Sequence, residues 1–590
     1  MDKTSIAVVT VCVLIMGWWL YEQQKFAQQQ SLLAPAPVVQ TTGGGPGPAG
    51  GPGIATVAAL MPFDTNLPER TLTLTNRNAR YTFTSRGGGL KMVELLDYPE
   101  KISLRWKKAS DTDTNAVATL NARAQFPALA ILGDPALMGD GNFTLTATAG
   151  GVRAEKVLPD GLRVQKNFQL SSNYLMDASV RLENGSDGPL TLPAQEWVVG
   201  TAMPMDVDDN GLAWGAMWYD GAKVQDCAPS SFAGGWFRGP PRTEYRMGSN
   251  NVYWVAIHNQ FFTLMAMSST NQPAAQILGR PVNLPWLATP TATTPPVGVQ
   301  ASLVYPGRTL AAHAAVERSL VLYAGPKEYR GLARIGEDFQ NHADLVMNFG
   351  FFGFFAKALL LGMNWIHDMT TLGYGWTIVL ITLLLRALFW PLTAASTRSM
   401  KRMQALAPKL NALKEKYKDD VQKLTAKQWE LYKENKVSPM SGCLPMMVQM
   451  PVFIGFFTMI RSAIELRGAH FLWVTDLSKP DTLWMIPGVN FPFNLLPLLM
   501  VAAMVWQAHL QPPSPGMDPG QQKMMRFMPV IMLLFLYTYS SGMALYMTVS
   551  TLAGAFQTKL TKINTPAAAV VAAPAAPVDA RLTPRQKKAK

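Results

Sequence analysis

The sequence predicts a membrane protein that joins an α-helical bundle of six spans to a large all-β domain. Three observations lead to this fold class. The 590-residue chain is 48% hydrophobic and only 15% charged, which is a low charge content for a soluble protein. Several apolar stretches reach the roughly 20 residues needed to cross a bilayer. Residues 59–325, between the first and second of these stretches, instead alternate between polar and apolar side chains.

Residues 1–22 are expected to form an N-terminal transmembrane anchor. The apolar run from Ile6 ends with Trp18, Trp19 and Tyr21, aromatic residues typical of the membrane interface. A cleaved signal peptide is the alternative, but no small-residue cleavage site precedes the polar flank. Residues 23–58 are rich in Pro, Gly, Ala and Gln, which predicts a flexible linker.

Residues 59–325 are expected to form an antiparallel β-sandwich. Runs such as TLTLTNRNARYTFTS and MDASVRLENGS alternate with period two and are separated by Gly, Asn and Asp. The tryptophans of this region suit either a ligand cleft or an ordinary β core, and the core is the commoner case. They are Trp197, Trp214, Trp218, Trp236 and Trp254. We find no catalytic constellation and no metal-ligand spacing, so no cofactor or metal is predicted.

Residues 326–372 are expected to form two short amphipathic helices lying in the membrane interface. Gly350 and Gly353 interrupt an apolar run that would otherwise be long enough to span. Polar residues mark one helical face before the glycines and a different face after them, which favours two interfacial helices over one span.

Five further spans are expected within a helical core at residues 373–560. They lie at residues 374–393, 443–464, 494–511, 527–540 and 542–558. The loop 398–436 holds eleven basic and five acidic residues, so the positive-inside rule places it in the cytoplasm. Counting spans from this loop puts both termini inside and the β domain outside. The tail 561–590 ends in RLTPRQKKAK, which is basic, as the rule expects for a cytoplasmic segment.

The cytoplasmic loop carries leucines and a tyrosine at helical spacing on both sides of the charged run Lys418-Asp419-Asp420. This pattern predicts an antiparallel helical hairpin, although an ordinary solvated helical loop fits it equally well. The residues concerned are Leu406, Leu410, Leu413, Tyr417, Leu424 and Leu431.

Arg386 is the clear charge within a predicted span. An arginine near the middle of a span costs about 2.5–3.5 kcal/mol even on the lenient insertion scale. Thr382, Thr393 and Thr397 share its helical face, which indicates a polar stripe. The alternative is that Arg386 extends to the headgroup region, and the threonines make this alternative weaker.

Methionine is abundant, with 32 residues, and many of them lie in or near the spans. Met447, Met450 and Met547 belong to this set. Flexible thioethers suit a surface that accepts apolar segments of varied sequence, whereas gap-filling is the commoner role of any single methionine.

The membrane segments resemble the YidC/Oxa/Alb family of membrane protein insertases over roughly 375–560. The matching segments are TIVLITLLLRALFWPLT, KVSPMSGCLPMMVQMPVF, DPGQQKMMRFMPVIM and SSGMALYMTVSTL. The β domain and the basic tail are similar to those of the YidC branch of Gram-negative inner membranes.

The resemblance implies a periplasmic β-supersandwich and a five-helix insertase core around a groove, with a mobile cytoplasmic hairpin. Arg386 and Thr382 align with groove residues of the family. The last span has Leu545-Tyr546-Met547 where the family often has Leu-Tyr-Tyr, so the role of the second tyrosine is not carried over. The substrate groove is accordingly expected to involve Arg386, Thr382, Thr393, Met447, Met450, Tyr546 and Met547.

The implied function is to insert nascent inner-membrane proteins and help them fold, alone or with the Sec translocon. The basic tail predicts contact with the ribosome or anionic lipids, and no motif for DNA binding is present. Enzyme motifs are absent, so no catalytic residue is predicted. A small-solute transporter using Arg386 as an anion site is the alternative, but we find no inverted repeat. A membrane-anchored periplasmic sugar-processing enzyme would leave the helical half without a role.

Overall fold

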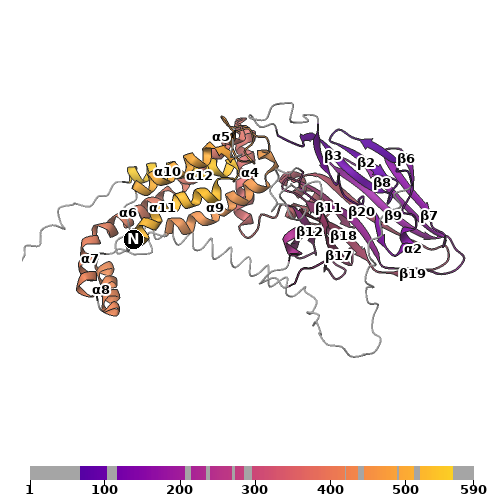
Figure 1. Ribbon diagram of the computed structural model, residues 1–590, viewed down its shortest axis with the longest axis horizontal. Coiled ribbons are helices and arrows are strands. Elements are labelled where there is room, and N and C mark those ends of the chain that lie inside the picture. The colour runs from indigo at the N-terminus through magenta and orange to yellow at the C-terminus, as the bar shows by residue number, and fades with distance from the viewer. Residues whose placement is uncertain are drawn as a thin grey trace, which may run out of the picture.

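The computed structural model describes residues 67–102, 116–205, 214–233, 240–268, 273–284, 296–418, 420–435, 444–487, 491–510 and 519–561. The predicted anchor 1–22, the linker 23–58 and all but the first residue of the tail 561–590 lie outside these ranges. The described chain is elongated, with the helices at one end and the sheets at the other (Figure 1).

The β part is a sandwich whose larger layer is a nine-stranded antiparallel sheet. Its strands, in spatial order, are β13 (Val224–Cys227), β12 (Gly215–Tyr219), β15 (Trp254–His258), β16 (Phe262–Ser268), β20 (Ala315–Pro326), β9 (Leu175–Asn184), β8 (Leu162–Leu170), β7 (Gly151–Val157) and β6 (Thr144–Thr148). Strand β9 alternates between buried and more exposed residues along its length, because one face meets the core and the other meets solvent.

A five-stranded antiparallel sheet forms the facing layer. Its order is β14 (Tyr245–Met247), β17 (Gln276–Asn283), β18 (Val297–Tyr305), β11 (Gln195–Ala202) and β5 (Ile131–Gly133). Strands β11 and β18 pack across β15. Every residue of β11 is buried, which is why a period-two pattern does not mark this strand in the sequence.

Smaller elements complete the β part. A four-stranded sheet has the order β1 (Thr71–Thr75), β2 (Ala79–Thr84), β3 (Gly89–Pro99) and β4 (Val117–Leu120), and β10 (Leu190–Leu192) pairs with β19 (Arg308–Leu310). The short helical turns are α2 (Pro135–Met138) and η2 (Pro229–Ser231). The sequence left open whether the tryptophans of this region line a cleft or fill the core. Trp197, Trp218 and Trp254 are fully buried, and Trp214 is nearly so. Trp236 lies outside the described residues.

The segment predicted as interfacial helices holds α3 (Tyr329–Asp338), the 3-10 turn η4 (Ala343–Met347) and α4 (Gly353–Thr370). Glu328 caps α3 by accepting a hydrogen bond from the Gly331 backbone N–H. Helix α4 is longer than the sequence pattern indicates, and it packs along α9 and α5. Its placement in a membrane interface stays a prediction.

The helical part continues beyond α4 with a series of α-helices. They are α5 (Tyr374–Leu388), α6 (Trp390–Ala405), α7 (Ala407–Lys416), α8 (Val421–Glu434), α9 (Leu444–Ser462), α10 (Leu495–Leu510), α11 (Pro519–Leu536) and α12 (Ser541–Leu560), with the 3-10 turn η6 (Ile464–Leu466) after α9. Helix α12 packs along both α10 and α5, and α11 packs along α10.

The span predicted at residues 374–393 differs from the observed helices. Helix α5 ends at Leu388, and α6 begins at Trp390 and runs on to Ala405. Pro391 lies in the first turn of α6 and has no N–H to donate to the carbonyl of Ala387, so the hydrogen-bond ladder is interrupted there.

No single helix among the described residues is both long and apolar enough to cross a membrane unaided. Helices α4 and α5 meet these criteria together, as a pair bent by 117° at the break between them. The predicted count of six spans is therefore not confirmed.

Hydrogen bonds join the β part to the helices. The Trp254 indole N–H donates to the carbonyl of Asn341 at 2.9 Å, and Arg467 Nη2 donates to the carbonyls of Pro99 and Glu100 at 2.7 and 3.0 Å. One apolar core also runs across the junction, from Met217 and Trp254 to the buried residues of α4 and α9. The two parts are therefore packed together, not merely tethered.

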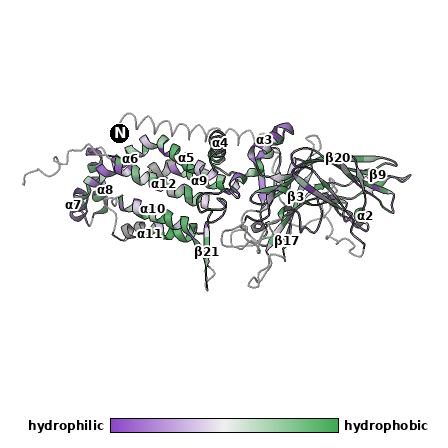
Figure 2. Ribbon diagram, turned by 90° about the horizontal axis from the view of Figure 1, so that it is seen from above, coloured by the Kyte–Doolittle hydropathy of each residue, from purple (hydrophilic) through white to green (hydrophobic). Residues whose placement is uncertain are grey.

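A hairpin of β21 (Thr482–Ile486) and β22 (Phe491–Asn494) projects from the helical part (Figure 2). The rings of Trp484 and Phe493 stack at 4.4 Å between centroids. At its base, Asp481 Oδ2 accepts hydrogen bonds from the backbone N–H groups of Leu495 and Leu496, which caps the start of α10.

Candidate functional site

Arg386 lies in the last turn of α5 and points at α12. Its Nε and Nη2 atoms donate to the hydroxyl oxygen of Ser550 at 3.0 and 2.7 Å. The side chain is half-buried, and it forms no ion pair with any residue that the structure describes. A guanidinium has five donors, so a single hydroxyl leaves much of its hydrogen-bonding capacity unused.

Gly554 gives the guanidinium room to approach α12. A β-carbon at this position would lie 3.4 Å from Arg386 Nη1 and 3.2 Å from Gln507 Nε2 of α10. Both distances are tighter than ordinary side-chain contacts. The glycine therefore lets two polar side chains meet at one point on the surface of α12.

A small recess adjoins Arg386, with about 210 Å³ of space between side chains, part of it open to solvent. Its lining includes Thr382, Phe389, Gln449 and Tyr546. Thr382 is buried, and its hydroxyl donates to the carbonyl of Ile378 at 2.6 Å. Because that proton is used within α5, Thr382 presents only acceptor capacity to the recess.

Tyr546 and Met547 are neighbours on α12 but lie in different surroundings. Tyr546 stacks on Phe456 at 4.1 Å between ring centroids, and its hydroxyl accepts a hydrogen bond from Gln449 Nε2 at 3.0 Å. Met547 is buried in the apolar core and does not line the recess. The structure thus places Tyr546 beside Arg386 and Met547 away from it.

Thr393 meets α12 further along α6. Its hydroxyl donates to the carbonyl of Phe389 at 2.9 Å and accepts a hydrogen bond from Gln557 Nε2. Beyond it, Lys401 Nζ donates to the carbonyl of Thr561 at 2.9 Å. Together these contacts form what we call the polar seam, made of Arg386, Thr393 and Lys401 on one side and Ser550, Gln557 and Thr561 on the other.

Apart from Tyr546, which was expected to line the groove, the polar residues on this face of α12 were not foreseen from the sequence. Tyr546, Ser550, Gln557 and Thr561 stand at i, i+4, i+11 and i+15, which places them on one helical face. The same spacing rule that marked the threonines around Arg386 would have found this second stripe. Each residue is only moderately polar, however, so none of them stands out alone in an apolar stretch.

The methionines divide into two groups. Met459, Met500 and Met543 are buried, which is the gap-filling role. Met450 on α9 is 45% exposed, and Met524 and Met528 on α11 are exposed as well. The side chain of Met447 lies outside the described residues. Exposed methionines are therefore found on both α9 and α11.

The loop residues predicted for a hairpin fall on α7, α8 and their flanks. Leu406 and Leu410 are buried together with Met403, and Leu431 packs against this cluster. Leu413, Tyr417 and Leu424 are half-buried and lie outside it. Asp420 caps α8 by accepting a hydrogen bond from the Lys423 backbone N–H at 3.0 Å.

The described residues hold no group of three or more His, Cys, Asp or Glu side chains able to bind a metal ion. The fold and the seam thus define a two-part protein, in which an apolar helical bundle carrying a half-buried cation adjoins a β-sandwich.

Comparison with known proteins identifies both parts. A family profile described as "60Kd inner membrane protein" matches residues 365–568, and one described as "YidC periplasmic domain" matches residues 71–361. The two profiles describe a class of inner-membrane proteins with a periplasmic β-sandwich domain. The two matches together cover most of the chain, and the chain belongs to the YidC family.

Curated proteins with sequences similar to this chain are named membrane protein insertase YidC. That of Pseudomonas fluorescens (strain Pf-5) is 41% identical over 246 residues, covering 42% of this chain and 40% of the relative. That of Pseudomonas putida (strain F1) is 41% identical over 236 residues, covering 40% of this chain and 39% of the relative. The chain thus spans about two fifths of the length of these relatives. A solved structure of an active YidC insertase shares 19% identity, with a TM-score of 0.32, and the match covers 84% of this chain and 93% of that one.

Proposed function

We propose that this protein is a membrane protein insertase and chaperone, which inserts nascent inner-membrane segments and helps them fold, alone or with the Sec translocon. The observation that carries this proposal is Arg386, a half-buried cation bound to one hydroxyl and to no described carboxylate, beside a small recess. Such a cation is available to an acidic group on an incoming chain.

In this mechanism the positive charge attracts acidic residues of the translocating tail. The attraction between unit charges about 4 Å apart ranges from about 1 kcal/mol in water to about 4 kcal/mol near a partly hydrated protein surface. The apolar part of the segment then partitions into lipid, where burial yields roughly 25 cal/mol per Å² of apolar surface. No nucleotide is consumed, because the driving force is this transfer from water.

The size of the recess limits what can enter it. A helix with its side chains is about 10–12 Å across, so a space of about 210 Å³ cannot enclose one. We therefore expect only the polar side chains of the substrate to reach Arg386, while its apolar body lies against the outside of the bundle. The exposed apolar face of α11, with Phe527, Met528 and Leu534, suits that body, as does Met450 on α9.

The remaining parts receive supporting roles. The basic loop that holds α7 and α8 would guide the nascent chain, and the basic tail would contact ribosomal RNA or anionic lipid. In this topology both termini and the loop are cytoplasmic, and the β-sandwich is periplasmic.

Insertion into proteoliposomes tests the proposal. The substrate is a short single-span protein with an acidic tail, and the readout is protection of the translocated tail from added protease. We expect Arg386→Ala to reduce insertion about tenfold, the equivalent of one charge-assisted hydrogen bond. Arg334→Ala removes an exposed arginine from α3 and should leave insertion unchanged.

A second substrate, in which the acidic tail residues are replaced by their amides, sharpens the result. The Arg386→Ala defect should shrink with this substrate, because the charge attraction is already gone. Equal insertion by the wild type and Arg386→Ala with the acidic substrate would remove Arg386 from the mechanism.

A further inference from the structure

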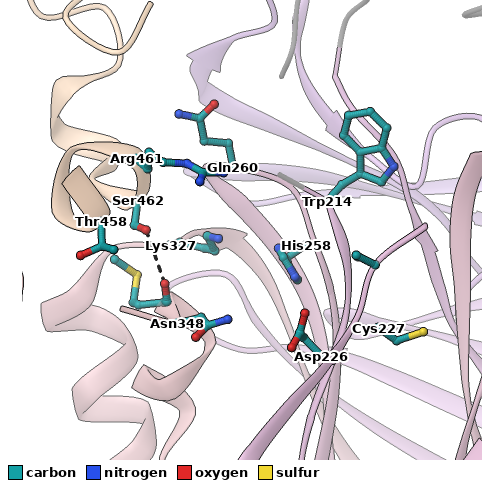
Figure 3. A pocket seen from close by; sticks show the side chains of 13 residues that line it. Trp214, Asp226, Cys227, His258, Gln260, Lys327, Asn348, Thr458, Arg461 and Ser462 are labelled. Carbon is teal, nitrogen blue, oxygen red and sulfur yellow. Dashed lines mark hydrogen bonds between the residues drawn. The ribbon is translucent and has the colours of Figure 1, made fainter. Parts of the chain in front are cut away.

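A second recess lies at the junction between the β-sandwich and the helices, and Arg386 does not line it. It has about 750 Å³ of space between side chains, part of it open to solvent. Strands β12, β13 and β15 line one side, and α9 with the residues after η4 lines the other (Figure 3). Nothing in the proposed insertion mechanism uses this recess.

Lys327 is the buried cation of this recess. It directly follows β20, where its backbone N–H donates to the carbonyl of Phe261 at 2.7 Å, and the residue is only 5% exposed. In the described chain its ammonium group has no hydrogen-bond acceptor and no ionic partner. Burial, together with the nearby charge of Arg461, lowers the pKa of Lys327 to about 7. An ammonium group held in this way is costly unless an anion joins it.

Arg461 supplies a second cation from the last turn of α9. Its guanidinium lies over the ring of Phe457 at 5.5 Å, and no described carboxylate pairs with it. Among the described residues of the lining, Asp226 is the acidic side chain, and Figure 3 shows it on the β13 side, across the recess from Arg461. The helix side of the recess is therefore positively charged.

Neutral polar groups complete the lining of the recess. His258 lies between Lys327 and Asp226, and burial together with the charge of Lys327 lowers its pKa to about 3, so it is neutral at physiological pH. Asn348 and Thr458 add an amide and a hydroxyl. Two cations with short polar side chains around them match the charge and the several acceptor oxygens of a phosphate group.

We propose that this junction recess is an anion site that takes a phosphate group between Lys327 and Arg461. The phosphate comes from the headgroup of an anionic phospholipid or is free in solution. The lipid source rests on the proposed topology, in which the end of α9 lies at the periplasmic surface of the inner membrane. The chemistry of the site does not depend on that topology. A bound phosphate would link the β-sandwich to the bundle through charge.

Thermal unfolding of the full-length protein in dodecyl maltoside micelles tests the site, because a ligand of the folded state raises the unfolding midpoint. One arm titrates inorganic phosphate against chloride at matched ionic strength. The other compares micelles containing phosphatidylglycerol with micelles containing diacylglycerol, which has no phosphate. The variants are Lys327→Met and Arg461→Gln, and the controls are Lys223→Met and Arg334→Gln, which remove exposed charges elsewhere on the two parts.

We expect a saturable rise in the midpoint for the wild type and both controls, with about tenfold weaker binding in Lys327→Met and in Arg461→Gln. A response in both arms assigns the site to free phosphate as well as to the headgroup. A response in the phosphate arm alone assigns it to free phosphate, and a response in the lipid arm alone assigns it to the headgroup. No response in either arm, or an equal response in all five proteins, overturns the proposal. Insertion is not measured, so neither result bears on the role of Arg386.

Discussion

Gly554 shows how the seam depends on the size of a residue as well as on charge. Alanine is ordinarily the better helix former by about 1 kcal/mol, so a glycine inside α12 weakens that helix. Its position is explained by the guanidinium of Arg386 and the amide of Gln507, which occupy the space that a side chain would fill. Helix stability is thus reduced where a polar contact is needed.

Replacing Gly554 by leucine should displace Arg386 from Ser550. We expect insertion of the acidic substrate to fall about as far as in Arg386→Ala. The leucine leaves the cation in the protein but moves it away from its position beside Ser550. In the double variant the two effects should overlap, since both act through one contact. Proteoliposome insertion by the two single variants and the double variant measures this.

Gly520→Leu is the matched control, because a β-carbon there meets nothing within 4 Å. It should insert the substrate as the wild type does. Fully additive losses in the double variant would show that Gly554 acts independently of Arg386.

Among the secondary-structure elements, the sequence was most informative where one face is buried. Strand β9 alternates as expected, whereas β11 is buried on both faces and carries no such signal. The polar face of α5 was visible because Arg386 is charged. Its counterpart on α12 was missed because hydroxyl and amide groups are common in spans. The end of α5 at Leu388 was also missed, although Pro391 suits the first turn of a helix and so could have marked the start of α6.

The pairing of α7 with α8 rests on a small cluster, so it should be the first part of the described helices to open. Leu410→Ala removes the most buried leucine of this cluster, and truncations of this kind cost about 2–5 kcal/mol in a full core. We expect faster amide hydrogen exchange in α7 and α8, with exchange in β8 and β9 unchanged. Mass-spectrometric peptide mapping follows all four elements.

Val421→Ala is the comparison within the same hairpin, because Val421 is 72% exposed. Its exchange pattern should match the wild type. Equal exchange in Leu410→Ala and the wild type would mean that this cluster does not hold the two helices together.

For the whole molecule, two buried lysines tie stability to pH. Lys166 is fully buried in the β-sandwich, where its ammonium donates to the carbonyls of Gly87 and Leu129 at 2.7 and 2.6 Å. Burial, and then the charge of Lys156, lowers the pKa of Lys166 to about 7. Lys327 has a pKa of about 7 as well. Both lysines keep their proton to a higher pH in the unfolded chain, where the ordinary value is 10.5.

Stability should therefore rise as the pH increases from 7 toward 10.5, because the unfolded chain binds more protons throughout that window. It should be lost again as the pH falls back toward 7. Each lysine contributes up to about 1.4 kcal/mol per pH unit. Denaturant unfolding at pH 7 and pH 9 measures the rise, and Lys166→Met should reduce it. An identical pH dependence in that variant would exclude Lys166 as a source.

The polar seam also fixes the register of α12. In lipid, apolar side chains can exchange one neighbour for another at little cost in free energy. Packing of apolar side chains alone would therefore let α12 slide along α5 and α6. Ser550 is bound by Arg386, and Gln557 donates to Thr393 and to the carbonyl of Trp390. A slip of one helical turn, about 5.4 Å, would break these pairings at once. Movements that admit a substrate segment are then confined to tilting or separation of whole helices. In such movements α12 keeps its position along its axis while the other helices shift relative to it.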